Sequence, residues 1–111
     1  MDNSSIYYKI CTIDEAGRIL LPAVLRQQLG WEVGDTLTVH VNLMHKFLEM
    51  IKQEFGELQV DKLGRIQFAE EFRRTMGWNA TDKIFVKLNV EASSVSLALD
   101  SKSVPALKLN G

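Results

Sequence analysis

The chain contains the same sequence pattern twice, at a shift of 47 residues. Residues 13–42 and 60–89 align without a gap, and ten of these thirty positions are identical. A repeat of this length predicts one compact α/β unit present in two copies. The identical pairs are Asp14/Asp61, Gly17/Gly64, Arg18/Arg65, Ile19/Ile66, Arg26/Arg73, Gly30/Gly77, Trp31/Trp78, Asp35/Asp82, Val39/Val86 and Asn42/Asn89.

The two copies are expected to share one hydrophobic core. A chain of 111 residues that is 46% hydrophobic can bury one modest core, whereas a single copy would be marginal alone. The connection at 52–57 is short and contains one glycine, Gly56, so it is too short to be a flexible linker between two separate domains. We therefore expect a single domain over 1–111, with repeat one at 6–53, repeat two at 54–100 and a loose tail at 101–111.

The composition limits which binding partners and which cellular compartment are expected for this protein. The formal net charge is -1, so any surface for nucleic acid must be a local basic patch. Cys11 is the single cysteine, which excludes an internal disulfide, suits a reducing cytosol and is most simply a small buried hydrophobe. The N-terminus lacks the pattern of a signal peptide, and no apolar run has the length of a membrane span. We expect a cytoplasmic protein with no membrane partner.

Copy one has the sequence signals of two strands followed by a helix. Residues 6–13 are rich in β-branched and aromatic residues, 14–17 form a turn, and 18–20 form a short strand. Pro22 fits the first turn of a helix, and Gly30 fits its left-handed end. Trp31 can then fold back onto the helix. The expected buried stripe of this helix is Leu21, Val24, Leu25 and Leu29.

Copy two repeats these signals with a more polar helix. Ala69 replaces the proline, and Glu71 stands where copy one has Val24. Phe68, Phe72, Met76, Gly77 and Trp78 keep the other positions. Each helix is followed by a predicted β-hairpin, with strands at 36–42 and 46–52 in copy one and at 83–89 and 94–100 in copy two.

The string D-E-A-G-R-I-L-L-P-A-V-L-R-Q-Q-L-G-W-x-x-G-D resembles the AbrB-type DNA-binding domain. This is the swapped-hairpin fold of transition-state regulators, SpoVT-like sporulation regulators and MazE antitoxins. The tandem arrangement is similar to that of the MraZ family, with a D-x-x-x-R motif at Asp14…Arg18 and again at Asp61…Arg65. The chain is shorter than MraZ and lacks its additional helical segments. Copy two also departs from the pattern through Ala69 and Thr81-Asp82.

The resemblance implies an α+β, mostly β fold: a swapped-hairpin, AbrB-like β-barrel built from two tandem β-β-α-β-β repeats that form an internal pseudo-dimer. It also implies that arginines of the turns and helices grip double-stranded DNA. Some family members carry a basic residue three positions before the motif aspartate, where this chain has Cys11 and Leu58. The DNA-binding residues that it implies are Arg18, Arg26, Arg65, Arg73 and Arg74.

Each of these arginines also has a purely structural interpretation. Arg18 and Arg65 can pair with the aspartate four residues earlier, although one carboxylate cannot use all five guanidinium donors. Arg73 and Arg74 can belong to a solvated helix face, with Glu70 as the partner of either. Trp31 and Trp78 follow helix-ending glycines and are expected in the core rather than against bases.

No motif of an enzyme is present. The sequence has no phosphate-binding loop, no dinucleotide fingerprint and no metalloprotease or hydrolase signature. His40 and His45 have no cysteine or carboxylate at ligand spacing, so we expect no metal, no cofactor and no small-molecule substrate.

The expected function is a DNA-binding transcriptional regulator. A net charge near zero predicts weak non-specific binding to DNA. Specific binding is therefore expected to need a homodimer or higher homo-oligomer, in which several subunits engage one site. The apolar cluster of Leu43, Met44 and Phe47 either forms that contact or caps the shared core. Two alternatives stay open: an antitoxin of a toxin–antitoxin pair, and an oligomerisation or protein-interaction module that has lost DNA binding.

Overall fold

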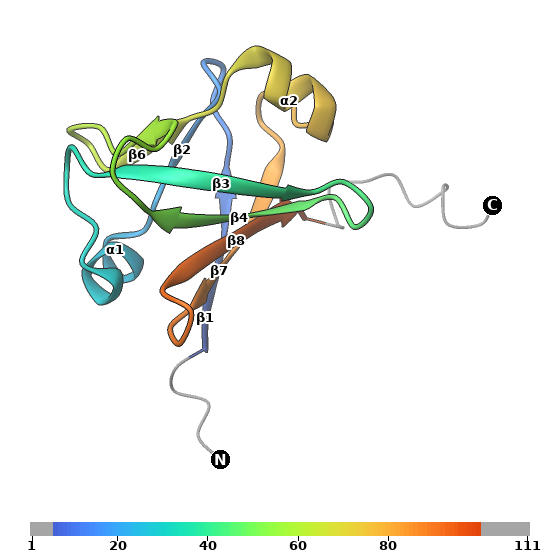
Figure 1. The fold of residues 1–111 in the computed structure, drawn as a ribbon. Helices are drawn as coiled ribbons and strands as arrows, with labels where there is room; N and C mark the ends of the chain where they lie inside the picture. The colour runs from blue at the N-terminus through green and yellow to red at the C-terminus, as the bar shows by residue number, and fades with distance from the viewer. Residues whose placement is uncertain (1–5, 101–111) are drawn as a thin grey trace.

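The computed structural model describes residues 6–100 (Figure 1). Residues 1–5 and 101–111, the latter being the expected loose tail, lie outside the described residues. In chain order the elements are β1 (Ile6–Thr12), β2 (Arg18–Leu20), α1 (Ala23–Leu29), β3 (Thr36–Asn42), β4 (Phe47–Lys52), β5 (Leu58–Gln59), β6 (Arg65–Gln67), α2 (Glu70–Met76), β7 (Lys83–Asn89) and β8 (Ser94–Leu99).

The strands form two antiparallel sheets. Six of them make a half-barrel in the order β1-β7-β8-β4-β3-β5, and β2 pairs with β6 in a separate two-stranded ribbon. The prediction of an α+β, mostly β fold is confirmed at this level. From β2 to β4, every element also has a counterpart of the same length that begins 47 residues later, between β6 and β8.

The expected element bounds agree with the structure to within a residue or two. β2, β3 and β7 have the predicted bounds, whereas β1, β4 and β8 are each one residue shorter than expected. The repeat also implies a counterpart of β1 in copy two, and this counterpart, β5, is much shorter, because only Leu58 and Gln59 pair with a neighbouring strand. Neither seven-residue helix has the length and apolar character that crossing a membrane requires.

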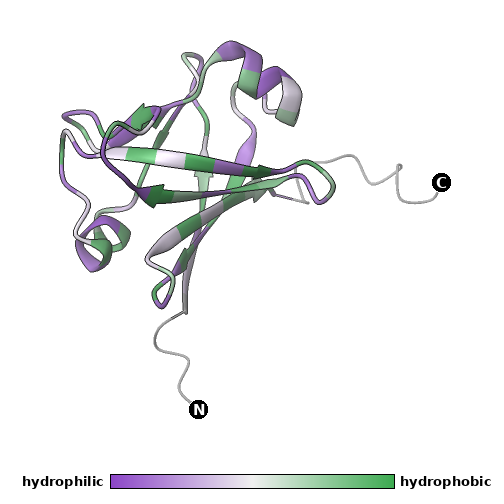
Figure 2. Cartoon of the chain, viewed as in Figure 1, coloured by the Kyte–Doolittle hydropathy of each residue, from purple (hydrophilic) through white to green (hydrophobic). Residues whose placement is uncertain are grey.

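One hydrophobic cluster fills the space between the half-barrel, the ribbon and the helices. Ile19 and Ile66 enter it from the ribbon and are fully buried or nearly so. Trp31 and Trp78 are 3% and 2% exposed, as expected for core residues. Figure 2 shows the hydrophobic residues spread along the strands, while α2 is largely hydrophilic. Cys11 is also buried in this cluster, and burial raises the pKa of its thiol.

Both helices end in the same hydrogen-bonded motif. Gly30 has a φ of 71° and its N–H bonds to the carbonyl of Gln27, while the Trp31 N–H bonds to the carbonyl of Arg26. These two bonds define a Schellman motif. The motif requires a residue in the left-handed backbone conformation, which glycine adopts without strain. Gly77 and Trp78 repeat the arrangement at the end of α2.

One position of the predicted helical stripe is wrong. Leu21 and Leu25 are fully buried, but Val24 is 48% exposed. The reason is that the helix is only seven residues long and rests on the core along one narrow line. Val24 lies beside that line, so Glu71 at the matching position of α2 is exposed as well.

Candidate nucleic-acid interface

The β2–β6 ribbon presents two arginines on its outer face. Arg18 is paired with Gln67 across the ribbon, and Arg65 is paired with Leu20. The central pair, Ile19 with Ile66, is buried. Because side chains alternate along a strand, residues beside this buried pair point to the opposite face. Leu20 is accordingly 55% exposed.

Each ribbon arginine is held by the aspartate that precedes its strand. Arg18 Nε donates to Asp14 Oδ2 at 2.8 Å, and Arg65 Nε donates to Asp61 Oδ2 at the same distance. The other carboxylate oxygen of Asp14 accepts the N–H groups of Ala16 and Arg18, so the aspartate organises the whole turn. The structural interpretation of these residues is therefore confirmed. The N–H groups on the Nη atoms of both arginines can still donate hydrogen bonds to a ligand.

The hydrogen bonds in these turns stabilise the ionised carboxylates. The backbone N–H of Arg18 is the main cause that lowers the pKa of Asp14, and partial burial opposes it. At Asp61 burial is the largest single cause and raises the pKa, but the hydrogen bonds from Arg65 and Leu63 and the charge of Arg65 together outweigh it and leave that pKa lowered. Each turn thus contains an Asp–Arg ion pair in which the two charges cancel.

Two further arginines come from the helices, and the side chain of each is held by a backbone carbonyl that lies just before its own helix. Arg26 Nε donates to the carbonyl of Leu21 at 3.2 Å, and Arg73 Nε donates to the carbonyl of Phe68 at 3.1 Å. Neither guanidinium is paired with a carboxylate in the described ion pairs. Each therefore contributes an uncompensated positive charge.

These helix arginines reach across to the turns of the opposite copy. A Cβ added at Gly64 would lie 2.7 Å from both Cζ and Nη2 of Arg26, and one added at Gly17 would collide with the guanidinium of Arg73. The same contacts are supported by the backbone, because the N–H of Leu21 bonds to the carbonyl of Gly64 at 3.0 Å. The N–H of Phe68 bonds to the carbonyl of Gly17 at the same distance.

The four guanidinium groups consequently gather around one ribbon. We call the surface formed by Arg18, Arg26, Arg65 and Arg73 the arginine face. Its side chains are partly buried and tethered, so little side-chain entropy remains to be lost when a ligand binds. Guanidinium donors in such an array suit the oxygens of successive phosphates.

Arg74 is placed differently from the other arginines predicted to bind DNA. Its side chain is exposed and pairs with Glu70 at 3.3 Å along α2. None of the described hydrogen bonds and ion pairs links it to the arginine face. A role for Arg74 in DNA binding remains a prediction.

Sequence reasoning did not identify three contributors to this surface. Gly17 and Gly64 provide the bare backbone on which the helix arginines rest. Gln67 lies on the exposed face of the ribbon, and its Nε2 donates to the carbonyl of Ala16 at 2.8 Å. The alternation in R-I-L and R-I-Q was the available signal for Gln67 and Leu20, since only the isoleucine enters the core.

Residues 6–100 contain no group of three or more His, Cys, Asp or Glu side chains that could hold a metal ion. His40 and His45, the two histidines of the chain, are both exposed.

No protein-family model and no curated protein matches this sequence. Among solved structures, the solution structure of PHS018 from Pyrococcus horikoshii is similar, with 20% sequence identity and a TM-score of 0.46. The similarity covers 90% of this chain and 92% of that chain.

Proposed function

We propose that this protein is a DNA-binding transcriptional regulator of the AbrB type that holds duplex DNA on its arginine face. The observation that carries the proposal is the convergence of four arginines, from both copies of the repeat, on one exposed two-stranded ribbon. A protein with net charge -1 needs such a local concentration of positive charge to bind a polyanion.

The proposal includes a swapped-hairpin architecture, in which the single chain is an internal pseudo-dimer. In support, β1 pairs with β7, β5 with β3, β4 with β8 and β2 with β6, so all pairing other than the two hairpins joins one copy to the other. Two of these pairs join equivalent positions, Ile19 with Ile66 and Glu49 with Ser96. An approximate two-fold axis through both pairs accounts for this register.

This symmetry suits a duplex, whose two backbones are themselves related by two-fold axes. Arg18 and Arg73, which lie at the same turn, would contact one strand, and Arg65 and Arg26 the other. Such contacts position the protein on the phosphates, and Gln67 offers an amide that can hydrogen-bond a base edge. Copy one has Leu20 at the equivalent position, so the two halves of the face differ in their polar contacts.

Four phosphate contacts give weak binding at physiological salt, so we further propose that copies assemble on one DNA site as a homodimer or higher oligomer. Leu43 and Met44, at the tip of the β3–β4 hairpin, are 56% and 85% exposed and are available for that contact. Phe47 is only partly exposed.

Fluorescence polarisation with labelled random genomic fragments, at two salt concentrations, tests the proposed function. Binding that weakens steeply as salt rises supports a DNA-binding regulator. The absence of binding at low salt would refute it and would favour the interaction module. A tight toxin partner recovered in place of DNA would favour the antitoxin.

A further inference from the structure

The two hairpins differ in how their outer edges are covered. Strand β7 is paired with β1 along its whole length, from Lys83 to Asn89. Strand β3 is paired with β5 at Thr36 and Leu37 alone. Among the described residues, 38–42 of β3 therefore have no strand on this edge.

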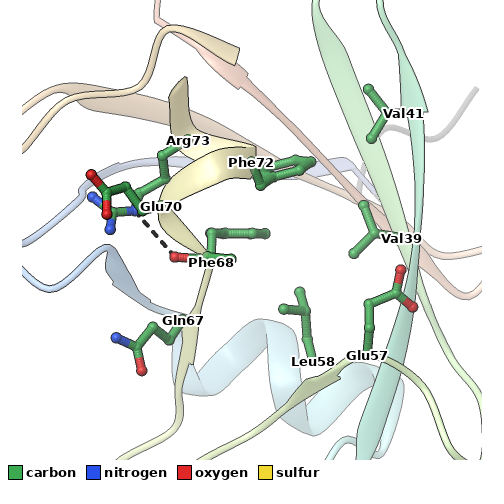
Figure 3. A pocket seen from close by; sticks show the side chains of 10 residues that line it. Val39, Val41, Glu57, Leu58, Gln67, Phe68, Glu70, Phe72 and Arg73 are labelled. Carbon is green, nitrogen blue, oxygen red and sulfur yellow. Dashed lines mark hydrogen bonds between the residues drawn. The ribbon is translucent and has the colours of Figure 1, made fainter. Parts of the chain in front are cut away.

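The uncovered edge borders an apolar groove of about 460 Å³. Figure 3 shows Val39 and Val41 of β3 on one side and Phe68 and Phe72 on the other, with Leu58 at one end. The residues of β7 that correspond to Val39 and Val41 are 0% and 2% exposed, whereas Val41 itself is 41% exposed. The apolar side chains at the outer edge of β3 are thus left partly exposed, whereas the equivalent side chains of β7 are covered.

Strand β1 shows what fills the equivalent place. Its Tyr7 lies beside Leu88 and packs against the core, and its Cys11 lies beside Ile84. Leu58 of β5 is the counterpart of Cys11 and lies beside Leu37. After that pair the match ends, because the residues of 53–57 turn away at the Thr36 end of β3, where Gly56 packs closely against the backbone of Leu37. An extended strand with a large apolar side chain at every second position fits what remains.

The chain has a segment with this pattern directly after β8. Residues 104–109 read Val-Pro-Ala-Leu-Lys-Leu, so Leu107 and Leu109 would share one face. Segment 101–111 has two lysines and no acidic residue, and the groove lining has two carboxylates, Glu57 and Glu70, with one arginine. Charge therefore favours this segment as well.

The path from β8 to the groove is short enough. Ala98 is paired with Phe47, and Phe47 with Asn42, so β8 leaves the sheet at the Asn42 end of β3. Reaching the far edge of β3 means crossing three strand spacings, roughly 14 Å. Residues 100–106 span about 20 Å when extended. The segment would then run antiparallel to β3, which is the direction that β1 takes along β7.

We propose that residues 104–109 of this chain dock into the groove of the same molecule as an additional edge strand of the half-barrel. Leu107 lies beside Val41, in the place that Tyr7 has on the other side, and Leu109 lies beside Val39. Pro105, which has no N–H to donate, falls outside the paired stretch. The docked strand covers the exposed edge of β3 and the part of Phe72 that faces the groove.

Hydrogen exchange of backbone amides, measured by NMR on the full chain, tests this docking. The groove-side amides of 38–42 should exchange at least about tenfold more slowly in the native protein than in the variant Leu107→Asp/Leu109→Asp. The control, Val104→Asp/Ala106→Asp, places the same charges on residues outside the groove and should leave the protection in place. Amides of β7 paired with β1 serve as the folding reference and should be unchanged in all three proteins.

Two results would overturn the proposal. Equal exchange at 38–42 in the native protein and the Leu107/Leu109 variant would mean that the groove is empty or has another occupant. Protection that rises with protein concentration would mean that a second copy supplies the strand. Neither result depends on DNA binding, so the docking and the proposed function fail separately.

Discussion

The guanidinium of Arg73 lies against the backbone of Gly17, a residue of the other copy of the repeat. The reverse contact, Arg26 against Gly64, completes the pair. These contacts place a charge from each helix beside a charge from the opposite turn. The arginine face is consequently a product of the way the copies interlock, and neither copy could form it alone.

Replacing Gly17 with alanine should displace Arg73. Gly17 has a φ of 82° and no room for a Cβ, whereas Gly30 has a φ of 71° with open space around it. Both Gly→Ala variants should lose about 1 kcal/mol of unfolding free energy, measured by urea denaturation, because alanine is strained at these angles. Gly17→Ala alone should also weaken DNA binding. Equal affinity for DNA in the two variants would contradict a role for Arg73.

Repeat one by itself, residues 6–53, should not be a stable monomer. In the full chain β1 pairs with β7, and β4 pairs with β8, so the fragment loses both partners and exposes the core. We expect it to aggregate or to self-associate so that a second fragment replaces repeat two. Analytical ultracentrifugation of the fragment gives the mass, and a well-folded monomer would contradict an internal pseudo-dimer.

The stability of the fold should fall in acid through the turn aspartates. Asp14 and Asp61 have pKa values below the ordinary 3.8, so their ionised forms stabilise the folded state. This contribution is complete above that value and is lost as the pH falls through the lowered pKa values. Melting temperatures followed from about pH 6 to about pH 3 should drop less in Asp14→Asn/Asp61→Asn than in the native protein, although the variant starts lower. An identical drop in both proteins would assign the acid sensitivity to other groups.

The core should be far more sensitive to truncation at Leu25 than at Val24. Leu25 is 0% exposed and Val24 is 48% exposed, although the two are adjacent on α1. Leu25→Ala should cost about 2–5 kcal/mol of unfolding free energy. Val24→Ala should change it by no more than about 0.5 kcal/mol. Comparable losses measured by urea denaturation would mean that the helix packs differently.

Local signals in the sequence were enough to locate most of the elements. Gly30 and Gly77 marked the helix ends, and the predicted bounds of β3 and β7 match the structure to the residue. The burial of Val24 was predicted wrongly, because the helical period identifies a face but not how much of it the neighbouring elements cover. The repeat also did not reveal that β5 is shorter than β1, since that difference follows from the packing of Gly56 on Leu37.

The candidate site was predictable only in part. The resemblance pointed to Arg18, Arg26, Arg65, Arg73 and Arg74, and the structure brings the first four together. The resting place of Arg73 on Gly17 has no local sequence signal, because it depends on how the two copies cross. The groove beside β3 has none either, since Val39 and Val41 look as well buried in the sequence as their β7 counterparts.

The salt dependence of DNA affinity tests the central claim most directly. For one labelled duplex, log K against log salt should lose about two units of slope in Arg26→Ala/Arg73→Ala, because each arginine is expected to neutralise one phosphate. Lys9→Ala/Lys87→Ala removes the same charge from exposed residues of the β1–β7 pair and should leave the slope nearly unchanged. A native slope in the arginine variant, with its fold intact by circular dichroism, would contradict DNA binding on the arginine face.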